Sequence, residues 1–285
     1  MSEPTGIDVL ARPLPSRAGR NLPLATAVGL GLLGAVGASL YFRKEAFIGL
    51  ALLACGAGLW ELGQAMTRRG IHIPLLPLLV GTAGILVSSY TGGPEALLVA
   101  FMLTAGGVVV WRVLDGGGQE ALRDAASATF AAAYIPFMAG FVMLMLAEAD
   151  GARRVALFVL LAVANDVGGY AAGVLFGRHP LAPSVSPKKS WEGLGGSLVL
   201  ACAVGAVGMG LAFEARPVVG IALGVASVLT ATLGDLAESL IKRDLELKDM
   251  GSLLPGHGGV LDRIDSLLLT APLVYLVLHV LVPVA

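Results

Sequence analysis

The residue types that could do chemistry are concentrated between Ser239 and Asp265, in a chain otherwise rich in Leu, Val, Ala and Gly. This segment holds most of the charged and imidazole groups of the C-terminal third, including Lys242, Arg243, Lys248, Asp249, His257, Asp262, Arg263 and Asp265. Gly258 and Gly259 can adopt positive φ, so their backbone N–H groups could approach an anion closely. These residue types suggest the chemistry of phosphate groups.

Carboxylates on predicted helical faces flank this segment. Four upstream residues share one face because they are spaced at i, i+3, i+4 and i+7: Asp235, Glu238, Ser239 and Lys242. Asp262 and Asp265 form a second pair, three residues apart. Magnesium is usually held by one or two carboxylates together with substrate phosphates. The pattern therefore predicts Mg²⁺ beside a phosphate site, and the alternative is a loop whose charges only solvate two helix ends.

The composition of the chain is that of a membrane protein. Of its 285 residues, 56% are hydrophobic and 14% are charged, and the mean hydropathy is +0.83. A soluble domain would have about a quarter of its residues charged. Cys55 and Cys202 lie far apart in apolar stretches, so we expect small core residues there, with no disulfide or metal site.

Apolar runs define the expected architecture, an all-α integral membrane protein with about nine transmembrane helices. A polar tail, residues 1–23, precedes a single polytopic membrane domain, residues 24–285. The first run is long for a signal peptide, so we interpret it as a retained span. Glycines four residues apart, such as Gly169 and Gly173, predict close helix packing. The expected spans are residues 24–41, 46–66, 74–90, 95–111, 127–147, 153–176, 193–213, 217–240 and 265–283.

Basic residues predict the orientation of these spans. With the N-terminus in the cytoplasm and the C-terminus outside, 14 of the 19 Lys and Arg residues fall on the cytoplasmic side, as the positive-inside rule requires. Loops 178–192 and 241–264 are then both cytoplasmic, and residues 112–126 are expected to form a flexible cytoplasmic connection. We therefore expect a multi-pass plasma-membrane protein whose active site faces the cytoplasm.

Two further features lie near the expected span of residues 153–176. Asp166 is ionisable within an apolar run, where a charge is costly, so it marks a functional site by default. The next loop contains Ser186-Pro187-Lys188-Lys189-Ser190-Trp191-Glu192-Gly193. Its lysines could bind a triphosphate. Equally, Lys and Trp could anchor the chain at the membrane interface.

The two motifs together resemble the signature of the phosphatidate cytidylyltransferases, or CDP-diacylglycerol synthases. The pattern S-x-x-K-R, K-D, H-G-G and D-R-x-D is complete between Ser239 and Asp265. The block S-P-K-K-T-W-E-G is also present, with Ser190 in place of the usual Thr. Pro180 departs from the family, because a basic residue is common there. The motifs cover residues 160–270, and the rest of the chain is similar by hydropathy alone.

The resemblance implies a nucleotidyltransferase of phospholipid biosynthesis that converts CTP and phosphatidic acid into CDP-diacylglycerol and pyrophosphate. It implies Mg²⁺ bound by Asp235, Asp262 and Asp265, with a second cation nearby. The residues expected in catalysis are Lys242, Arg243, Lys248, Asp249, His257, Arg263 and Asp166. The residues expected to bind substrate are Ser186, Lys188, Lys189, Ser190, Trp191, Glu192, Ser239, Gly258 and Gly259. The implied partners are CTP, phosphatidic acid, membrane lipids and a second copy of the chain, with no nucleic acid.

Two other classes of function fit part of the pattern. A CTP-dependent lipid kinase of the polyprenol type would pass the γ-phosphate to an alcohol, but we would expect it to lack the full H-G-G and D-R-x-D arrangement. A transporter could also carry a mid-span acid such as Asp166 and glycine-interrupted helices. Against a transporter, the charges cluster in loops and paired halves are not visible in the sequence.

Overall fold

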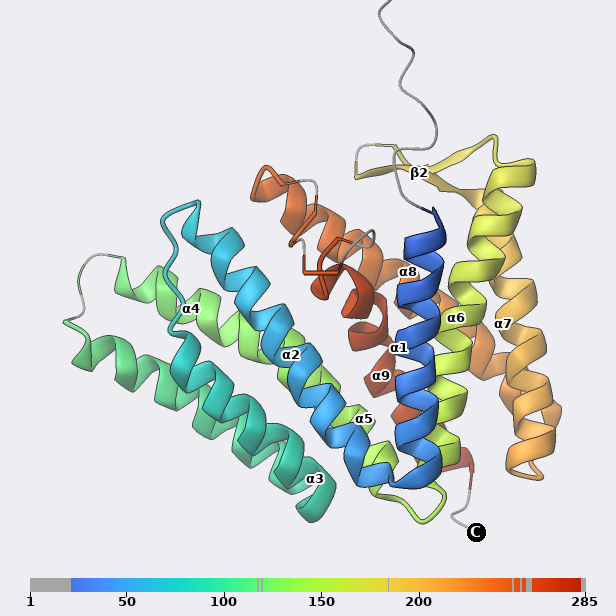
Figure 1. The fold of residues 1–285 in the computed structure, drawn as a ribbon, viewed down its shortest axis with the longest axis horizontal. Coiled ribbons are helices and arrows are strands. Elements are labelled where there is room, and N and C mark those ends of the chain that lie inside the picture. The colour runs from blue at the N-terminus through green and yellow to red at the C-terminus, as the bar shows by residue number, and fades with distance from the viewer. Residues whose placement is uncertain are drawn as a thin grey trace, which may run out of the picture.

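The computed structural model describes residues 22–116, 118, 120–183, 185–247, 249–251, 253–254 and 258–282, without the side chains of residues 22–26, 187 and 188. The described chain is a bundle of apolar helices (Figure 1). Its elements are α1 (Leu22–Phe42), α2 (Lys44–Thr67), α3 (Leu75–Leu114), α4 (Ala121–Ala132), the π-helix η1 (Ala133–Phe137), α5 (Met138–Ala147), α6 (Gly151–Phe176), β1 (Pro180–Ala182), β2 (Ser186–Ser190), α7 (Trp191–Ala212), α8 (Pro217–Asp244) and α9 (Leu261–Leu281).

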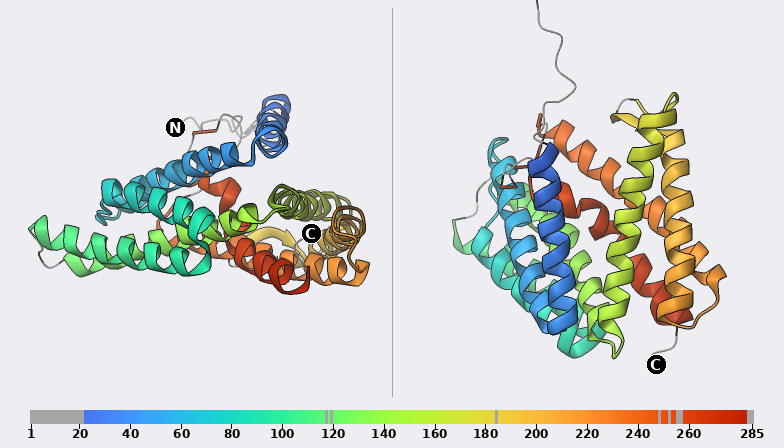
Figure 2. Two further views of the ribbon diagram at one scale, coloured as in Figure 1. Left: turned by 90° about the horizontal axis from the view of Figure 1, so that it is seen from below. Right: turned by 45° about the vertical axis from the view of Figure 1, so that its right-hand side comes forward.

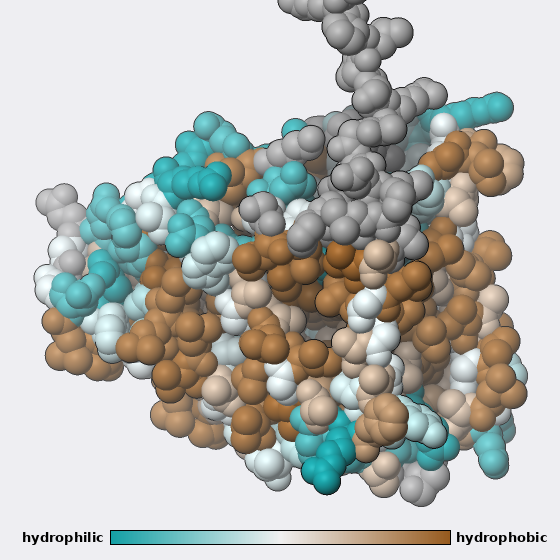
Figure 3. All heavy atoms as spheres, viewed as in Figure 1, coloured by the Kyte–Doolittle hydropathy of each residue, from teal (hydrophilic) through white to brown (hydrophobic). Residues whose placement is uncertain are grey.

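Helix length and composition confirm a helical membrane protein. Within the described residues, seven helices are long and apolar enough to cross a bilayer, counting α4, η1 and α5 as one stretch from Ala121 to Ala147. Helix α1 adds a shorter apolar stretch, Ala27–Phe42. Figure 3 shows hydrophobic side chains over the middle of the bundle and hydrophilic ones gathered toward its two ends. Such a surface matches a molecule whose middle faces hydrocarbon.

Helix α3 is a helical hairpin. Its 40 residues would extend about 60 Å if straight, twice the thickness of a bilayer core. Gly93, with φ 77° and ψ −164°, interrupts the helix just before Pro94. A Cβ added at Gly81 would collide with the side chain of Thr104, and these residues are nearly equidistant from Gly93 in sequence. The chain therefore reverses at Gly93, and its two halves pack side by side (Figure 1).

The bundle has two distinct ends. At the end drawn uppermost in Figure 1 lie the β1–β2 hairpin, the start of α9 and the connection from α2 to α3. At the opposite, lower end lie the α1–α2, α5–α6 and α7–α8 junctions and the end of α9 (Figure 2). We call these the upper end and the lower end. Residues far apart in sequence meet at each end, which allows each end to build its own charge network.

Helices α6, α7 and α8 pack closely through glycines. A Cβ at Gly168 would lie 2.5 Å from the backbone oxygen of Gly196, and a Cβ at Gly169 would lie 2.7 Å from the hydroxyl of Ser197. The expectation of close packing at the glycine stripe of α6 is confirmed. Because the backbones approach so closely, polar side chains on α6 and α7 are held within reach of one another.

Two short strands are an exception to the expected all-helical fold. Strands β1 and β2 pair antiparallel, with Pro180 opposite Ser190 and Ala182 opposite Ser186. Proline favours extended backbone before it and interrupts helices, so a loop with prolines at 180, 183 and 187 forms a hairpin instead. The Arg243 side chain supports this hairpin because its Nε donates to the Val185 carbonyl at 2.7 Å.

The expected flexible connection over residues 112–126 is wrong at both of its ends, which are helical. Helix α3 ends at Leu114 and α4 begins at Ala121. Asp124 is only 1% exposed; its carboxylate pairs with Arg112 at 2.9 Å and accepts the His72 backbone N–H at 3.0 Å. This buried ion pair fixes the end of α3 against the start of α4.

Candidate functional site

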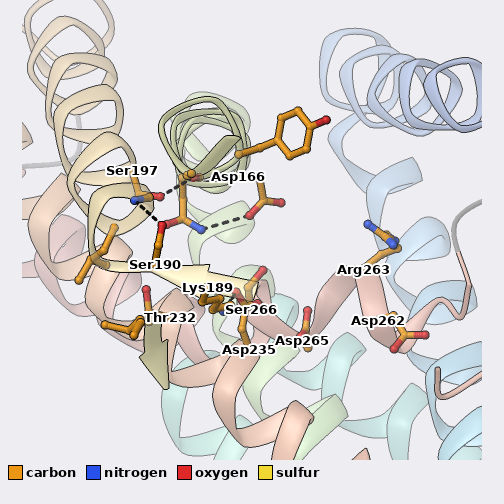
Figure 4. A pocket seen from close by; sticks show the side chains of 17 residues that line it. Asp166, Lys189, Ser190, Ser197, Thr232, Asp235, Asp262, Arg263, Asp265 and Ser266 are labelled. Carbon is orange, nitrogen blue, oxygen red and sulfur yellow. Dashed lines mark hydrogen bonds and ion pairs between the residues drawn. The ribbon is translucent and has the colours of Figure 1, made fainter. Parts of the chain in front are cut away.

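Four helices and the hairpin enclose a pocket of about 440 Å³ at the upper end of the bundle (Figure 4). Its wall is built by α6, α7, α8, α9 and both strands of the hairpin. Most of the side chains that line it are polar or charged, namely Asn165, Asp166, Tyr170, Lys189, Ser190, Ser197, Thr232, Asp235, Asp262, Arg263, Asp265 and Ser266. A polar cavity among apolar helices is where a charged substrate could be handled.

Helical spacing places the acids of α8 and α9 on the pocket wall. Thr232 and Asp235 lie three residues apart on α8, as do Asp262 and Asp265 on α9, so each pair shares a face. The helices touch at Gly234, where a Cβ would lie 3.0 Å from the Asp265 carbonyl oxygen. This close approach brings carboxylates from two helices to one cavity.

One side of the pocket is a hydrogen-bonded polar group on α6 and α7. The Asn165 side-chain amide donates to Asp166 Oδ1 at 3.1 Å, and the Ser197 hydroxyl donates to the Asn165 backbone carbonyl at 2.6 Å. The charged groups that act on Asp166 include Asp235, Lys189 and Arg263. Figure 4 shows Asp166 facing the same central space as Asp235 and Arg263. The mid-span acid predicted from the sequence therefore belongs to the pocket.

Lys189 connects the hairpin to α8. Its ammonium forms an ion pair with Asp235 Oδ2, and both side chains remain partly exposed, at 28% and 27%. Ser190, the next residue, is the N-cap of α7: its hydroxyl accepts the Gly193 N–H at 3.1 Å, which caps the first turn. The hairpin thus delivers one cation and one hydroxyl to the pocket.

The Asp262 carboxylate accepts hydrogen bonds from three groups. Lys242 Nζ donates to its Oδ1 at 3.0 Å, while the backbone N–H groups of Gly259 and Met250 donate to its Oδ2 at 2.8 and 3.1 Å. Lys242 also pairs with Glu238, one turn earlier on α8. Lys242 is therefore held between two carboxylates in this structure and does not line the pocket. These donors occupy most of the lone-pair sites of the carboxylate, so a ligand of Asp262 would take the remaining site or displace a donor.

The structure brings part of the predicted set together. The pocket lining includes seven of the predicted residues: Asp166, Lys189, Ser190, Asp235, Asp262, Arg263 and Asp265. Nine predicted residues lie elsewhere at the upper end, outside the lining: Lys242, Arg243, Asp249, Ser186, Trp191, Glu192, Ser239, Gly258 and Gly259. Lys248, His257 and the side chain of Lys188 lie outside the described residues.

Glu192 and the glycines of the H-G-G segment already have partners within the chain. Glu192 Oε2 accepts the backbone N–H groups of Arg178 and His179 at 3.2 Å each, and Oε1 contacts His179 Nδ1 at 2.6 Å. Gly258 takes the expected positive φ, 88°, and lies close to Asp249. Its N–H donates to the Leu254 carbonyl at 3.2 Å. These groups hold their own loops closed.

Sequence reasoning missed Glu61. This α2 residue is 1% exposed, and its Oε2 accepts the Leu261 backbone N–H, at the start of α9, at 2.9 Å. A signal was present, because Glu61 is an acid within an apolar run, which is the criterion that identified Asp166. Ser197, Thr232 and Ser266 were also missed, and single hydroxyls in apolar runs carry no comparable signal.

Comparison with known proteins shows which family the chain resembles along its length. The model of the cytidylyltransferase family matches residues 24–281. The protein named phosphatidate cytidylyltransferase in Mycobacterium leprae is 41% identical over 282 residues, which is 93% of this chain and 90% of that protein. Its namesake in Mycobacterium tuberculosis is 37% identical over 93% of this chain and 85% of that protein. A namesake in Haemophilus influenzae is 44% identical over 48% of this chain and 51% of that protein.

Proposed function

The chain belongs to the cytidylyltransferase family, and we propose on this basis that it is a membrane nucleotidyltransferase that transfers CMP from CTP to phosphatidate. The products are CDP-diacylglycerol, a precursor for phospholipid synthesis, and pyrophosphate. The observation that carries the proposal is the 37–41% identity, over 93% of this chain, to proteins named phosphatidate cytidylyltransferase. Neither a lipid kinase nor a transporter gains a specific supporting observation.

The reaction needs positioning more than acid–base chemistry. A phosphate oxygen of the lipid forms a bond to the α-phosphorus of CTP, while the bond from that phosphorus to the α–β bridging oxygen breaks. Pyrophosphate leaves with the electron pair. The lipid phosphate is already anionic, so the protein's task is to align two anions and neutralise them.

Lys189 and Arg263 are the cations of the pocket lining, and we assign them to the phosphates of the two substrates. Lys242 supports the same site by neutralising Asp262 and Glu238. The remaining predicted contacts stay proposals on the motif alone: Lys188, Arg243, Lys248, Asp249, His257, Ser186, Trp191, Ser239, Gly258 and Gly259. Asp166 would orient a substrate or metal group from the α6 side.

The carboxylates in and around the pocket are ligands of the type that a magnesium ion prefers. In and around the pocket, five carboxylates (Asp166, Asp235, Glu238, Asp262 and Asp265) face three cations (Lys189, Lys242 and Arg263). Glu238 Oε1 is buried and has no hydrogen-bond partner among the described residues. Carboxylates therefore outnumber basic side chains here, and carboxylate oxygens are the ligands that a hard cation prefers. Bound Mg²⁺ would neutralise the departing pyrophosphate.

We assign Mg²⁺ to Asp235, Asp262 and Asp265, with a second cation nearby. Within the part of the chain that the structure describes, no three His, Cys, Asp or Glu side chains are placed to hold a metal ion by themselves. Magnesium commonly retains waters and takes substrate phosphates as ligands. In this arrangement the three carboxylates would therefore divide between the two cations, with CTP phosphates and waters as the further ligands.

For the membrane, we propose nine crossings with a cytoplasmic N-terminus, an external C-terminus and the pocket facing the cytoplasm. The reversal at Gly93 supports counting α3 twice, and 14 of 19 basic residues favour this orientation. The plasma membrane, contacts with its lipids and a homodimer belong to the same proposal. A cysteine at Leu253 should react only with cytoplasmic thiol reagents; labelling from outside intact cells would contradict the orientation.

The activity is tested with CTP labelled at either the α- or the γ-phosphorus. Purified protein in detergent is incubated with phosphatidate, Mg²⁺ and one of the two nucleotides, and the organic phase is counted. Label from the α-phosphorus should enter lipid, and label from the γ-phosphorus should leave as pyrophosphate. Label from γ but not from α would identify a lipid kinase and overturn the proposal.

A further inference from the structure

Glu61 is a buried carboxylate in a membrane-spanning helix, outside the pocket lining. Burying a carboxylate among apolar helices is costly unless hydrogen bonds compensate it. Its neighbours Leu59 and Leu62 are buried hydrophobic residues and offer the carboxylate no polar side chain. The reason for this acid must therefore lie in what its two oxygens contact.

One oxygen of Glu61 caps α9. The first N–H groups of a helix have no partner within the helix, and the helix dipole favours an anion there. Val260, the residue at the N-cap position of α9, has no side-chain cap. Glu61 Oε2 takes this role from another helix by accepting the Leu261 N–H at 2.9 Å.

The same carboxylate also packs against the segment that precedes α9. A Cβ at Gly259 would lie 2.6 Å from Glu61 Oε2, and a Cβ at Gly251 would collide with Oε1. Both positions therefore need glycine for the chain to fold over Glu61. Oε1 lies against the same segment at Gly251 and accepts no hydrogen bond from the described residues.

Glu61 and Asp262 both accept backbone hydrogen bonds from residues around the start of α9. Gly259 donates its N–H to Asp262 at 2.8 Å while Leu261, two residues later, donates to Glu61. Asp262 and Arg263, in the first turn of α9, line the pocket. Gly58, one turn before Glu61, lies where a Cβ would contact Leu261 and Ile264 at 3.6 Å. The α2 surface thus supports the whole first turn of α9.

We propose that Glu61 is a positioning residue for the cytidylyl transfer: by capping α9 and seating the glycines before it, Glu61 fixes where Asp262 and Arg263 meet the substrate. It does not touch the substrate itself. The inference deepens the proposed function, on which its kinetic test rests. It also gives the N-terminal helices, which contribute no residue to the pocket lining, a part in the reaction.

The test compares Glu61→Ala with Glu61→Gln. The Ala variant loses the cap, and a first turn displaced by about 1 Å is expected to lower kcat/KM by roughly 100-fold and to raise the Mg²⁺ concentration needed for half-maximal rate. The Gln variant keeps an oxygen that can accept the Leu261 N–H, so it should recover most of this loss. A Glu61→Ala enzyme with wild-type kcat/KM and Mg²⁺ dependence would overturn the proposal.

Asp150→Asn is the matched control. Asp150 is 5% exposed and pairs with Arg154 at 2.6 Å at the lower end, so its substitution disturbs an equally buried carboxylate far from the pocket. We expect a lower Tm with unchanged Mg²⁺ dependence. If Asp150→Asn shifts the Mg²⁺ dependence as much as Glu61→Ala does, the effect reflects general destabilisation and the proposal is wrong.

Hydrogen–deuterium exchange separates this inference from the proposed activity. The amides of Gly259 and Leu261 should exchange faster in Glu61→Ala than in the wild type or in Asp150→Asn, whatever reaction the protein catalyses. Unchanged exchange at these amides would overturn the positioning role even if turnover fell. A wild-type protein that makes no CDP-diacylglycerol, with faster exchange in Glu61→Ala, would refute the activity alone.

Discussion

The two ends of the bundle use basic residues in different ways. At the lower end, Lys44 donates to the carbonyls of Leu146 and Glu148 at 3.1 and 2.9 Å, around the end of α5. Arg153 donates to the carbonyl of Ala212, the last residue of α7, at 2.9 Å. Each cation closes a helix C-terminus, where unpaired carbonyls and the helix dipole favour positive charge.

At the upper end, the basic residues beside the pocket face carboxylates. Lys189 pairs with Asp235, and Lys242 with Glu238 and Asp262. A cation bound to backbone carbonyls stabilises the fold and has no reason to exchange partners. A cation bound to a carboxylate beside a cavity can exchange that partner for a substrate phosphate. A carboxylate partner beside the pocket therefore indicates a cation that could meet a substrate phosphate, whereas the carboxylate partner of Arg154 lies away from the pocket lining.

The largest expected effect is that of Asp235→Asn, which removes a pocket carboxylate while keeping its size. If Asp235 helps to hold Mg²⁺, kcat should fall roughly 1,000-fold, as for the loss of a central electrostatic contact. The Tm should change little, because the side chain is 27% exposed. Initial rates over a range of Mg²⁺ concentrations, with thermal unfolding in the same detergent, measure both quantities.

A near-normal rate for Asp235→Asn at limiting Mg²⁺ would remove Asp235 from the metal site. The distinction between the two ends would then lose its main support, since Lys189 and Asp235 would be an ordinary surface pair.

Arg154→Met, at the lower end, is expected to lower stability and to leave the rate nearly unchanged. Arg154 is 1% exposed and donates to Asp150 at 2.6 Å and to the carbonyls of Leu278 and Val282 at 3.0 Å each. Removing one partner of a buried ion pair costs about 3–5 kcal/mol of unfolding free energy. The Tm should fall markedly, while kcat measured well below the transition stays within about twofold of wild type. A large loss of kcat in folded protein would show that the lower end also supports the reaction.

A direct comparison of the two ends uses one substitution at each, Lys189→Met and Lys44→Met. Losing a pocket cation that meets a phosphate should lower kcat/KM for CTP by about 10- to 100-fold, the effect of one charge-assisted hydrogen bond in a desolvated site. Lys44→Met should leave kcat/KM unchanged and lower the Tm slightly, because only a helix cap is lost. Equal losses of kcat/KM in the two variants would contradict the assignment of Lys189 to a substrate phosphate.

Much of the fold follows from the sequence because hydrophobic length is a local property. The reversal at Gly93 and Pro94 separates two apolar runs that the sequence also separates. The pocket residues Asp166, Asp235 and Asp265 were also predictable, since a charge within an apolar run and an i, i+3 spacing both depend on neighbouring residues only.

The partners of these residues could not be predicted. Helical spacing tells which residues share a face but not which face of another helix lies opposite. Glu61 and Leu261 are 200 residues apart, and Arg243 meets Val185 through a hairpin that the expected all-helical fold did not contain. Lys242 lies one turn after Glu238, so that pair follows from helical spacing, but the contact of Lys242 with Asp262 on α9 could not be predicted.

The smallest expected effect concerns Glu192, where the motif and the structure suggest different roles. If Glu192 binds substrate, as the resemblance implies, Glu192→Gln should raise the KM for CTP about tenfold. Its contacts favour a role in closing the hairpin, since Glu192 accepts the N–H groups of Arg178 and His179 and contacts the His179 ring. A Gln oxygen can still accept from the backbone, so we expect the KM to change by less than about threefold.

A double-mutant cycle distinguishes these two roles of Glu192. His179→Ala alone removes the ring contact, and in the hairpin role it should cause the same small change in KM as Glu192→Gln, with no further change when both are combined, because each removes one shared interaction. If Glu192 instead meets CTP, the two changes should add, since the substrate contact does not pass through His179. Additive changes, or a tenfold rise in KM from Glu192→Gln alone, would show that Glu192 contacts the substrate.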